Sequence, residues 1–373
     1  MKLDCVYLQR LTNLFSENEA LSATSRQPPT TTAQSMSVEL AMCGMADVLA
    51  TAGRHPRPDA VAGDLRSWQH FHAITCSTFG NHKLSHIMRC VVANDAWKQP
   101  LLMHITLAFS SAHKRHLISD GSGTKTNGPK IEEAHHWQQG LQLYQAGLSH
   151  LTNGSSSSKQ YTDSLVAATF LIVMYTFTID NELPERSAVP SHEIDVAKAF
   201  APVAATRGFQ ALRSHLGDLQ GGSIWLPTVS ATRSIYESAE QEKLPQAFVE
   251  LCGLESSTPM QANSYHGIVR HLAVLLRLSG TQDNLSNLFG FSSRLWVFLG
   301  PMLQRQDARA LLIMAWWVAL LCQTNQWWTI ARSRKQCSSI VRCLSTSSDP
   351  LMQRLLEFPR TFGEADYAWI WDC

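Results

Sequence analysis

Hydrophobic residues recur every three or four positions along most of the chain, and polar stretches separate these runs. This spacing is typical of amphipathic helices. It predicts helices over residues 65–78, 84–93, 99–117, 131–151, 161–179, 197–216, 246–251, 269–278, 294–304, 330–344 and 350–358. No stretch of strand length shows convincing alternation of apolar and polar residues, and no repeat of fixed period is present. We therefore expect an all-α fold, a multi-helix bundle with a flexible N-terminal segment.

The most apolar stretch, Arg309–Trp328, reads RALLIMAWWVALLCQTNQWW and predicts a helix that is buried on every side. Its uninterrupted apolar run, Ala310–Cys322, is shorter than the span of about 20 residues that a membrane helix needs. A second apolar run, Leu165–Ile179, is also short and contains three threonines. Both runs are interpreted as central helices of a bundle, without a membrane-spanning role.

The clearest periodic stripe lies between residues 131 and 151 and is predicted to face the core. It consists of Ile131, Ala134, Trp137, Leu141, Tyr144, Leu148 and Leu151.

Two polar stretches near the N-terminus have the composition of linkers. Residues 26–37 (RQPPTTTAQSMS) contain tandem prolines and many hydroxyl groups, and residues 53–63 contain further proline and glycine. A short amphipathic helix over residues 3–15 is a possible dimerisation element. Residues 1–63 are therefore predicted to be a flexible segment and linker, and residues 64–373 to be one helical domain.

The overall charge is nearly balanced, with 31 Lys and Arg residues against 30 Asp and Glu. This balance does not indicate binding to nucleic acid or to a membrane surface. Residues 294–342 differ, because seven basic residues stand there against one acid. Nine scattered cysteines do not resemble a secreted disulfide scaffold, and the N-terminus has no secretory apolar region. A reduced protein of the cytosol or nucleus is expected.

No catalytic or metal-binding motif stands out. The glycine-containing stretch 121–128 lacks a Gly-Lys pair and follows a helix, and no G-x-S-x-G, H-E-x-x-H or C-x-x-C occurs. Neighbouring histidines and cysteines were weighed as ligand pairs, and core or carbonyl-bonded side chains are the simpler interpretation. These are His70 and His72, His113 and His116, His135 and His136, and Cys337 and Cys343. We expect no enzyme, no metal and no cofactor.

Two groups near the C-terminus are candidate binding residues. Core packing is the simpler interpretation of four tryptophans that are also suited to line a pocket for an apolar ligand: Trp316, Trp317, Trp327 and Trp328. A basic run containing Arg332, Arg334 and Lys335 is either a nuclear-import patch, a contact to phosphates or a solvated helix face.

The order of several segments resembles a known family. The carrying segments are PLLMHITLAFSSAHKRHL (100–117), HHWQQGLQLYQAGLSHL (135–151), DSLVAATFLIVMYTFT (163–178), TRGFQAL (206–212) and the tryptophan pair at 327–328. Over residues 64–360 they resemble the helical regulatory domain of fungal zinc-cluster transcription factors, most closely the sterol-uptake-regulator type. Each motif is loose, so their order carries the resemblance.

Two departures from this family matter. Its DNA-binding module uses six cysteines to hold two zinc ions in a basic N-terminal segment, whereas residues 1–63 hold only Cys5 and Cys43 and are slightly acidic. The chain is therefore not expected to bind DNA specifically by itself. Ala204 and Ala205 also stand where the family has a tryptophan.

The resemblance implies a nuclear transcriptional regulator that acts through protein contacts and that can shuttle with the cytoplasm. Expected partners are a finger-bearing transcription factor, a second copy of the chain, or an apolar molecule such as a sterol. Control of a pathway, for example in secondary metabolism, is a refinement of this expectation. The alternative is a helical carrier of an apolar small molecule whose resemblance reflects the fold alone.

Overall fold

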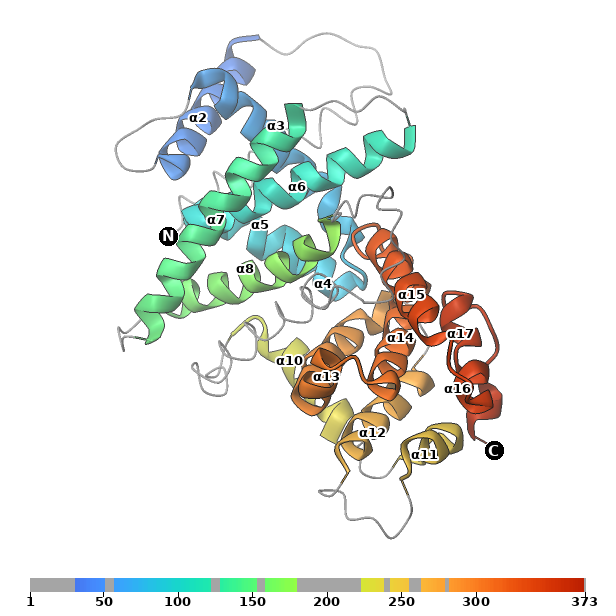
Figure 1. Cartoon of the computed structure of the whole chain (residues 1–373). Coiled ribbons are helices and arrows are strands. Elements are labelled where there is room, and N and C mark those ends of the chain that lie inside the picture. The colour runs from blue at the N-terminus through green and yellow to red at the C-terminus, as the bar shows by residue number, and fades with distance from the viewer. Residues whose placement is uncertain are drawn as a thin grey trace.

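The computed structural model describes residues 31–50, 57–121, 128–152, 158–179, 223–237, 242–254, 263–278 and 282–371. These residues form helices joined by turns and short irregular segments, and no strand occurs among them (Figure 1). The expected all-α multi-helix fold is confirmed. The predicted helices at 3–15 and 197–216 and the segment 206–212 lie outside the described residues.

The first half of the described chain forms one group of helices around α6 (Figure 1). It comprises α2 (Thr31–Leu49), α3 (Pro58–Ala73), η1 (Thr75–Thr78), α4 (His82–Ile87), the π-helical turn η2 (Met88–Val92), α5 (Ala93–Asp95), α6 (Pro100–Gly121), α7 (Gly128–Thr152) and α8 (Lys159–Thr178). Because α6 packs against α2, α3, α5, α7 and α8, it is the central element of this group.

The second half forms a group around α14 (Figure 1). It comprises α10 (Leu226–Glu237), α11 (Gln246–Cys252), α12 (Ser264–Arg277), η4 (Gln282–Asn284), α13 (Leu285–Gln304), α14 (Ala308–Gln323), α15 (Ile330–Leu344), α16 (Pro350–Leu355), α17 (Glu357–Arg360) and η5 (Ala368–Trp371). One continuous hydrophobic core joins the two groups.

Helix α14 is the buried centre that its composition predicted. Every residue from Ala310 to Cys322 is buried. The carboxylate of Asp307 caps its first turn by accepting hydrogen bonds from two backbone N–H groups, which would otherwise lack partners. The helix ends at Gln323, whereas the sequence predicted that it continues to Trp328. Asn325 takes a left-handed backbone conformation (φ 48°), which turns the chain before the tryptophan pair.

The predicted linker near the N-terminus is partly helical. Helix α2 covers the end of the predicted linker 26–37, and three of its apolar side chains, Ala41, Met45 and Leu49, are buried against the core. Helix α3 begins at Pro58, six residues before the predicted domain start, because proline suits a first helical turn. The packed helices therefore include residues that the sequence assigned to the flexible segment.

The predicted apolar stripe of α7 packs against the core, but the most buried face of the helix lies beside it. Ile131 is 73% exposed, and Trp137, Leu141 and Leu148 are half-buried. The fully buried positions follow the same helical spacing one face over: Glu133, His136, Gly140, Tyr144 and Gly147. Glycine suits two of these positions because a Cβ atom would collide with Ile105 of α6 at Gly140 and with Tyr161 of α8 at Gly147.

Helix α8 is long and apolar enough to cross a membrane, and 72% of its most apolar window is buried inside the protein. It packs against α6, α7 and α15. Its aromatic side chains contact both groups of helices: Phe170 stacks on Trp225, and Phe177 lies edge-on to Trp328.

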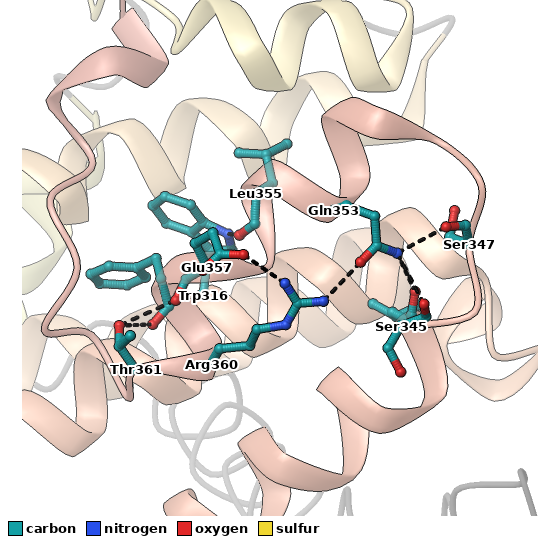
Figure 2. Close-up of polar contacts among 10 residues, drawn as sticks. Trp316, Ser345, Ser347, Gln353, Leu355, Glu357, Arg360 and Thr361 are labelled. Carbon is teal, nitrogen blue, oxygen red and sulfur yellow. Dashed lines mark hydrogen bonds and ion pairs between the residues drawn. The ribbon is translucent and has the colours of Figure 1, made fainter.

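A set of polar contacts fixes the turn between α15 and α16 (Figure 2). The side-chain amide of Gln353 donates hydrogen bonds to the carbonyl groups of Leu344, Ser345 and Ser347. The guanidinium group of Arg360 donates to the amide oxygen of Gln353 at 2.8 Å, which orients the amide. The last carbonyls of α15 thereby gain partners that the helix itself does not provide.

Candidate functional site

Buried polar side chains gather where α3, α6, α7 and α8 meet, inside the first group of helices. Such groups are uncommon in a core unless they are paired. This cluster is the candidate functional site, because several ionisable side chains are buried together there.

The centre of the cluster is a chain of three side chains from three helices. The carboxylate of Asp64 on α3 lies 2.9 Å from Nε2 of His136 on α7. The Nδ1 atom of His136 lies 2.9 Å from Nδ1 of His104 on α6. All three side chains are buried, and His104 is 2% exposed.

The carboxylate determines where the protons sit along this chain. An ionised carboxylate only accepts hydrogen bonds, so Nε2 of His136 carries the proton that faces Asp64. Nδ1 of a neutral His136 then accepts from Nδ1–H of His104. This leaves Nε2 of His104 unprotonated, and that buried atom has no partner among the described residues. Burial, together with His136 and His135, lowers the pKa of His104 to about 3.

A second buried contact lies one helical turn earlier on α7. Glu133 binds Arg115 through two hydrogen bonds of 2.7 and 3.0 Å, and its Oε1 atom also accepts a 2.8 Å bond from the hydroxyl of Tyr175. Burial and the neighbouring carboxylate raise the pKa of Tyr175, so its hydroxyl keeps the donated proton. The ring of Tyr175 stacks on Trp137 at 4.0 Å. This contact joins α6, α7 and α8.

A third contact links α6 to the tryptophan pair. The ring of His113 stacks on Trp327 at 4.4 Å, and its Nδ1 atom lies 2.9 Å from the hydroxyl of Thr75. The ring centre of His70 lies 5.1 Å from the ring centre of His113. Burial, followed by the nearby His70 and His116, lowers the pKa of His113 to about 4. His113 is therefore neutral near pH 7.

Ser67 and Lys114 resemble a nucleophile and its base, with Nζ of Lys114 2.9 Å from Oγ of Ser67. Burial, followed by Arg66, lowers the pKa of Lys114. Ser67, however, lies inside α3 and donates its proton to the carbonyl group of Gly63 at 3.0 Å. The amine thus donates to a hydroxyl that has already given its proton to the backbone. This arrangement holds α3 against α6 and does not prepare a nucleophile.

The histidine and cysteine pairs of the sequence have separate places. His113 and His116 both stack on Trp327, His72 stacks on Trp68, and His135 is exposed beside the buried His136. Cys337 is buried, and its thiol donates to the carbonyl group of Ala315, whereas Cys343 is half-buried. Among the residues that the structure describes, no group of three His, Cys, Asp or Glu side chains is arranged to hold a metal ion.

The four candidate tryptophans contact different elements. Trp316 stacks on Phe358 and donates to the carbonyl group of Leu355 (Figure 2), and Trp317 donates to the carbonyl group of Leu288. The indole of Trp327 donates to Thr78, and Trp328 stacks on Phe289. Three of these tryptophans are nearly inaccessible, namely Trp316, Trp317 and Trp328. Each indole thus contacts protein groups, although Trp327 is half-buried and the indole N–H of Trp328 has no hydrogen-bond partner among the described residues.

The basic residues of α15 have different surroundings. Arg332 donates to the carbonyl groups of Thr176 and Ile179, which satisfies the C-terminal end of α8. Arg334 is exposed, with its guanidinium group 5.6 Å from the ring centre of Phe362, and Lys335 is exposed on the same helix. Arg332 therefore binds the end of α8, whereas Arg334 and Lys335 are exposed on the surface.

Sequence reasoning missed Asp64, His104, Glu133 and Lys114 as members of a cluster. One signal was available, because the 3.6-residue spacing of Glu133, His136 and Gly140 on α7 matches one helical face. A polar face inside an apolar bundle was not anticipated. The sequence matches no model of a known protein family, and no curated protein is significantly similar to it.

Proposed function

We propose that the protein is a transcriptional regulator that acts through its helical domain and takes its DNA contact from a partner. The proposed partner is a finger-bearing transcription factor, and the proposed place of action is the nucleus. A second copy of the chain and an apolar molecule such as a sterol are further proposed ligands of the domain.

One observation supports this proposal above the others. The segments that carry the family resemblance are far apart in sequence, yet their described parts pack into one unit. Helices α6, α7 and α8 contact one another. The tryptophan pair, about 150 residues later, closes on them: Trp327 stacks on His113 of α6, and Trp328 meets Phe177 of α8. This packing is what the resemblance implies for segments of one regulatory domain.

The small number of cysteines in residues 1–63 supports the proposal that the DNA contact comes from a partner. Two zinc ions need more thiolates than Cys5 and Cys43 supply, and the slightly acidic segment offers little attraction for phosphates. Purified protein is expected to contain no stoichiometric zinc and to give no sequence-specific DNA shift.

The test tethers the full chain to a heterologous DNA-binding domain in a fungal host and measures a reporter gene with matching sites. We expect reporter expression to change several-fold relative to the DNA-binding domain alone. A variant with Ala315→Asp in the buried centre of α14 should lose this effect, because an unpaired carboxylate in that core unfolds the domain.

A fluorescent fusion of the full chain gives an independent reading of location. Nuclear signal in at least one growth condition supports the proposal. Exclusion from the nucleus in every condition, together with an unchanged reporter, would overturn it in favour of the carrier alternative. A content of about two zinc ions per chain would overturn the borrowed DNA contact.

A further inference from the structure

Helix α15 presents a basic face to the outside of the molecule. The helix carries Arg332, Arg334, Lys335 and Arg342 and no acidic residue, which gives it a net charge of +4. Its exposed positions follow one helical face: Ala331, Arg334, Lys335, Ser338 and Arg342. The opposite face, which includes Cys337, Ile340 and Leu344, is buried against the core. The burial pattern therefore fixes the outward direction of the charges.

Two of these charges lack an acidic partner in the part of the chain that the structure describes. No ion pair between described residues includes Arg334 or Arg342. The guanidinium group of Arg334 lies 5.6 Å from the ring centre of Phe362, and the side chain as a whole is exposed. A basic face of this kind favours an anionic occupant.

The chain itself leads from the end of α8 to this face. Arg332, in the first turn of α15, donates to the carbonyl groups of Thr176 and Ile179 at 2.9 and 3.2 Å. Residue 179 is the last described residue before the gap. Ile179, the residue that precedes the gap, therefore lies beside the N-terminal end of α15, next to the first charge of the basic face.

The residues that follow have the complementary charge. Residues 180–195 (DNELPERSAVPSHEID) contain five acidic residues and one arginine, a net charge of -4 with histidine neutral. The acids are Asp180, Glu182, Glu185, Glu193 and Asp195. The basic face from Arg334 to Arg342 extends over about 12 Å of helix, a distance that a few residues cover.

Chain length does not prevent this contact. The chain re-enters the described part at Ser223, whose hydroxyl donates to Asp163 near the start of α8. The two ends of the gap are thus separated by roughly the length of α8, about 30 Å. The intervening residues 180–222 reach on the order of 140 Å when extended, so ample chain remains for the return.

We propose that the basic face of α15 is a docking surface and that its occupant is the chain's own acidic stretch, residues 180–195. Single exposed ion pairs are weak. The covalent connection at residue 179 supplies a high effective concentration, which lets several weak pairs act together. Because the charges are near the surface, the contact should weaken as salt screens them.

The test measures cleavage of the full chain by a Glu-specific protease at Glu182, Glu185 and Glu193, with products identified by mass spectrometry. A synthetic peptide of residues 180–195 corrects for direct effects of salt on the protease. We expect cleavage in the chain to be several-fold slower than in the double variant Arg334→Glu, Arg342→Glu. Salt at 0.5 M should remove the difference, as expected when the Debye length falls to about 4 Å.

The matched control is the double variant Arg305→Glu, Arg309→Glu, which changes the net charge equally at exposed positions outside α15. It should leave cleavage unchanged. Adding Glu182→Arg and Glu185→Arg to the α15 double variant should restore protection at Glu193. Far-UV circular dichroism verifies that each variant is folded. Equal cleavage rates in the unmodified chain and the α15 variant, or equal acceleration in the control, would overturn the proposal.

A second measurement does not depend on substitutions at the arginines. Carbodiimide joins carboxylates to amines that are in direct contact, and Lys335 is the lysine of α15. We expect low-salt cross-links between Lys335 and acids of residues 180–195 that are absent for Lys83, an exposed lysine of α4. Cross-links found solely between different molecules would assign the surface to a second copy and reject the internal contact.

Discussion

The Nδ1 atoms of His104 and His136 lie 2.9 Å apart in the buried contact between α6 and α7. Two nitrogens at this distance share one proton, so a second proton on the pair would place two N–H groups against each other. The contact therefore requires that at least one of the rings is neutral. His104 is neutral, because burial, together with His136 and His135, lowers its pKa to about 3.

Stability should fall as the solution is acidified below about pH 6.5. The pKa values of His104 and His113 are lowered from the usual 6.5 to about 3 and about 4, so the folded protein stays neutral at these sites while the unfolded chain takes up protons. The unfolded state then binds more protons, and stability decreases with decreasing pH. For two such histidines the free energy of unfolding should fall by about 1 to 3 kcal/mol between pH 7.5 and 5.5.

Urea unfolding at a series of pH values measures this effect. His113→Phe should reduce the slope of stability against pH between pH 7.5 and 5.5, because it removes one of the two neutral histidines. His150→Phe is the control, since His150 is exposed on α7 and should leave the slope unchanged. Stability that is constant or increases on acidification in this range contradicts the assigned protonation states.

Glu133 should contribute strongly to stability although it is charged. Its carboxylate is buried and binds Arg115 twice and Tyr175 once. Glu133→Ala leaves the guanidinium group and the hydroxyl without their acceptor, and we expect a loss of about 2 kcal/mol, reduced from the fully buried case because Arg115 is partly exposed. Glu132→Ala, at the exposed neighbouring position, should change stability by less than about 0.5 kcal/mol. Similar losses for both variants in denaturant titration would disprove the role of the contact.

Substitution of alanine for glycine should lower the stability of the protein at one helical position and raise it at another. A Cβ atom at Gly140 on α7 would collide with the side chain of Ile105 on α6, so Gly140→Ala should destabilise by about 1 to 3 kcal/mol. Gly63 on α3 has no neighbour within 4 Å of such an atom, so Gly63→Ala should stabilise by up to about 1 kcal/mol through helix propensity. Thermal unfolding distinguishes these results, and stabilisation by both substitutions would mean that α6 and α7 are not in close contact.

The sequence predicted the helical elements well because each carries its own local signal. Residues 330–344 coincide with α15, and the short helix at Gln246 appears as α11. Helix α3 begins at Pro58, within a stretch whose proline and glycine were interpreted as a break. The same residues fit the first turn of α3, where proline is favoured.

The candidate site was much harder to predict, because its contacts join distant residues. Asp64 and His136 are 72 positions apart, and neither has a neighbour in sequence that indicates the pairing. The apolar stripe on α7 indicated residues that pack against the core but missed the most buried positions, since Gly140 and Gly147 have little hydrophobicity of their own. Glycines are buried there because they permit close packing of helices, and periodicity of hydrophobic residues does not detect that property.

The amide of Gln353 should stabilise the C-terminal end of α15 beyond what its partial exposure suggests. It donates to the carbonyl group of Leu344, the last residue of α15, and to two carbonyl groups in the turn that follows, and Arg360 orients it (Figure 2). Gln353→Ala removes these donors, and we expect a loss of about 1 to 2 kcal/mol in the free energy of unfolding. Hydrogen exchange should also become faster for the last turn of α15, with the first turn unaffected.

Gln353→Glu is the sharper variant, because it keeps the size of the side chain and replaces the donor with a carboxylate. The carboxylate still accepts from Arg360 but repels the three carbonyl oxygens, so it should be at least as destabilising as alanine. Arg354→Ala, at the adjacent exposed position, tests for a general effect of changing α16; it removes the contact with the ring of Trp369 and leaves the turn intact. Full stability of Gln353→Glu, together with a loss of stability in Arg354→Ala, would contradict the role assigned to the amide. The contact between Arg354 and Trp369 would then contribute more to the stability of this region than the amide of Gln353.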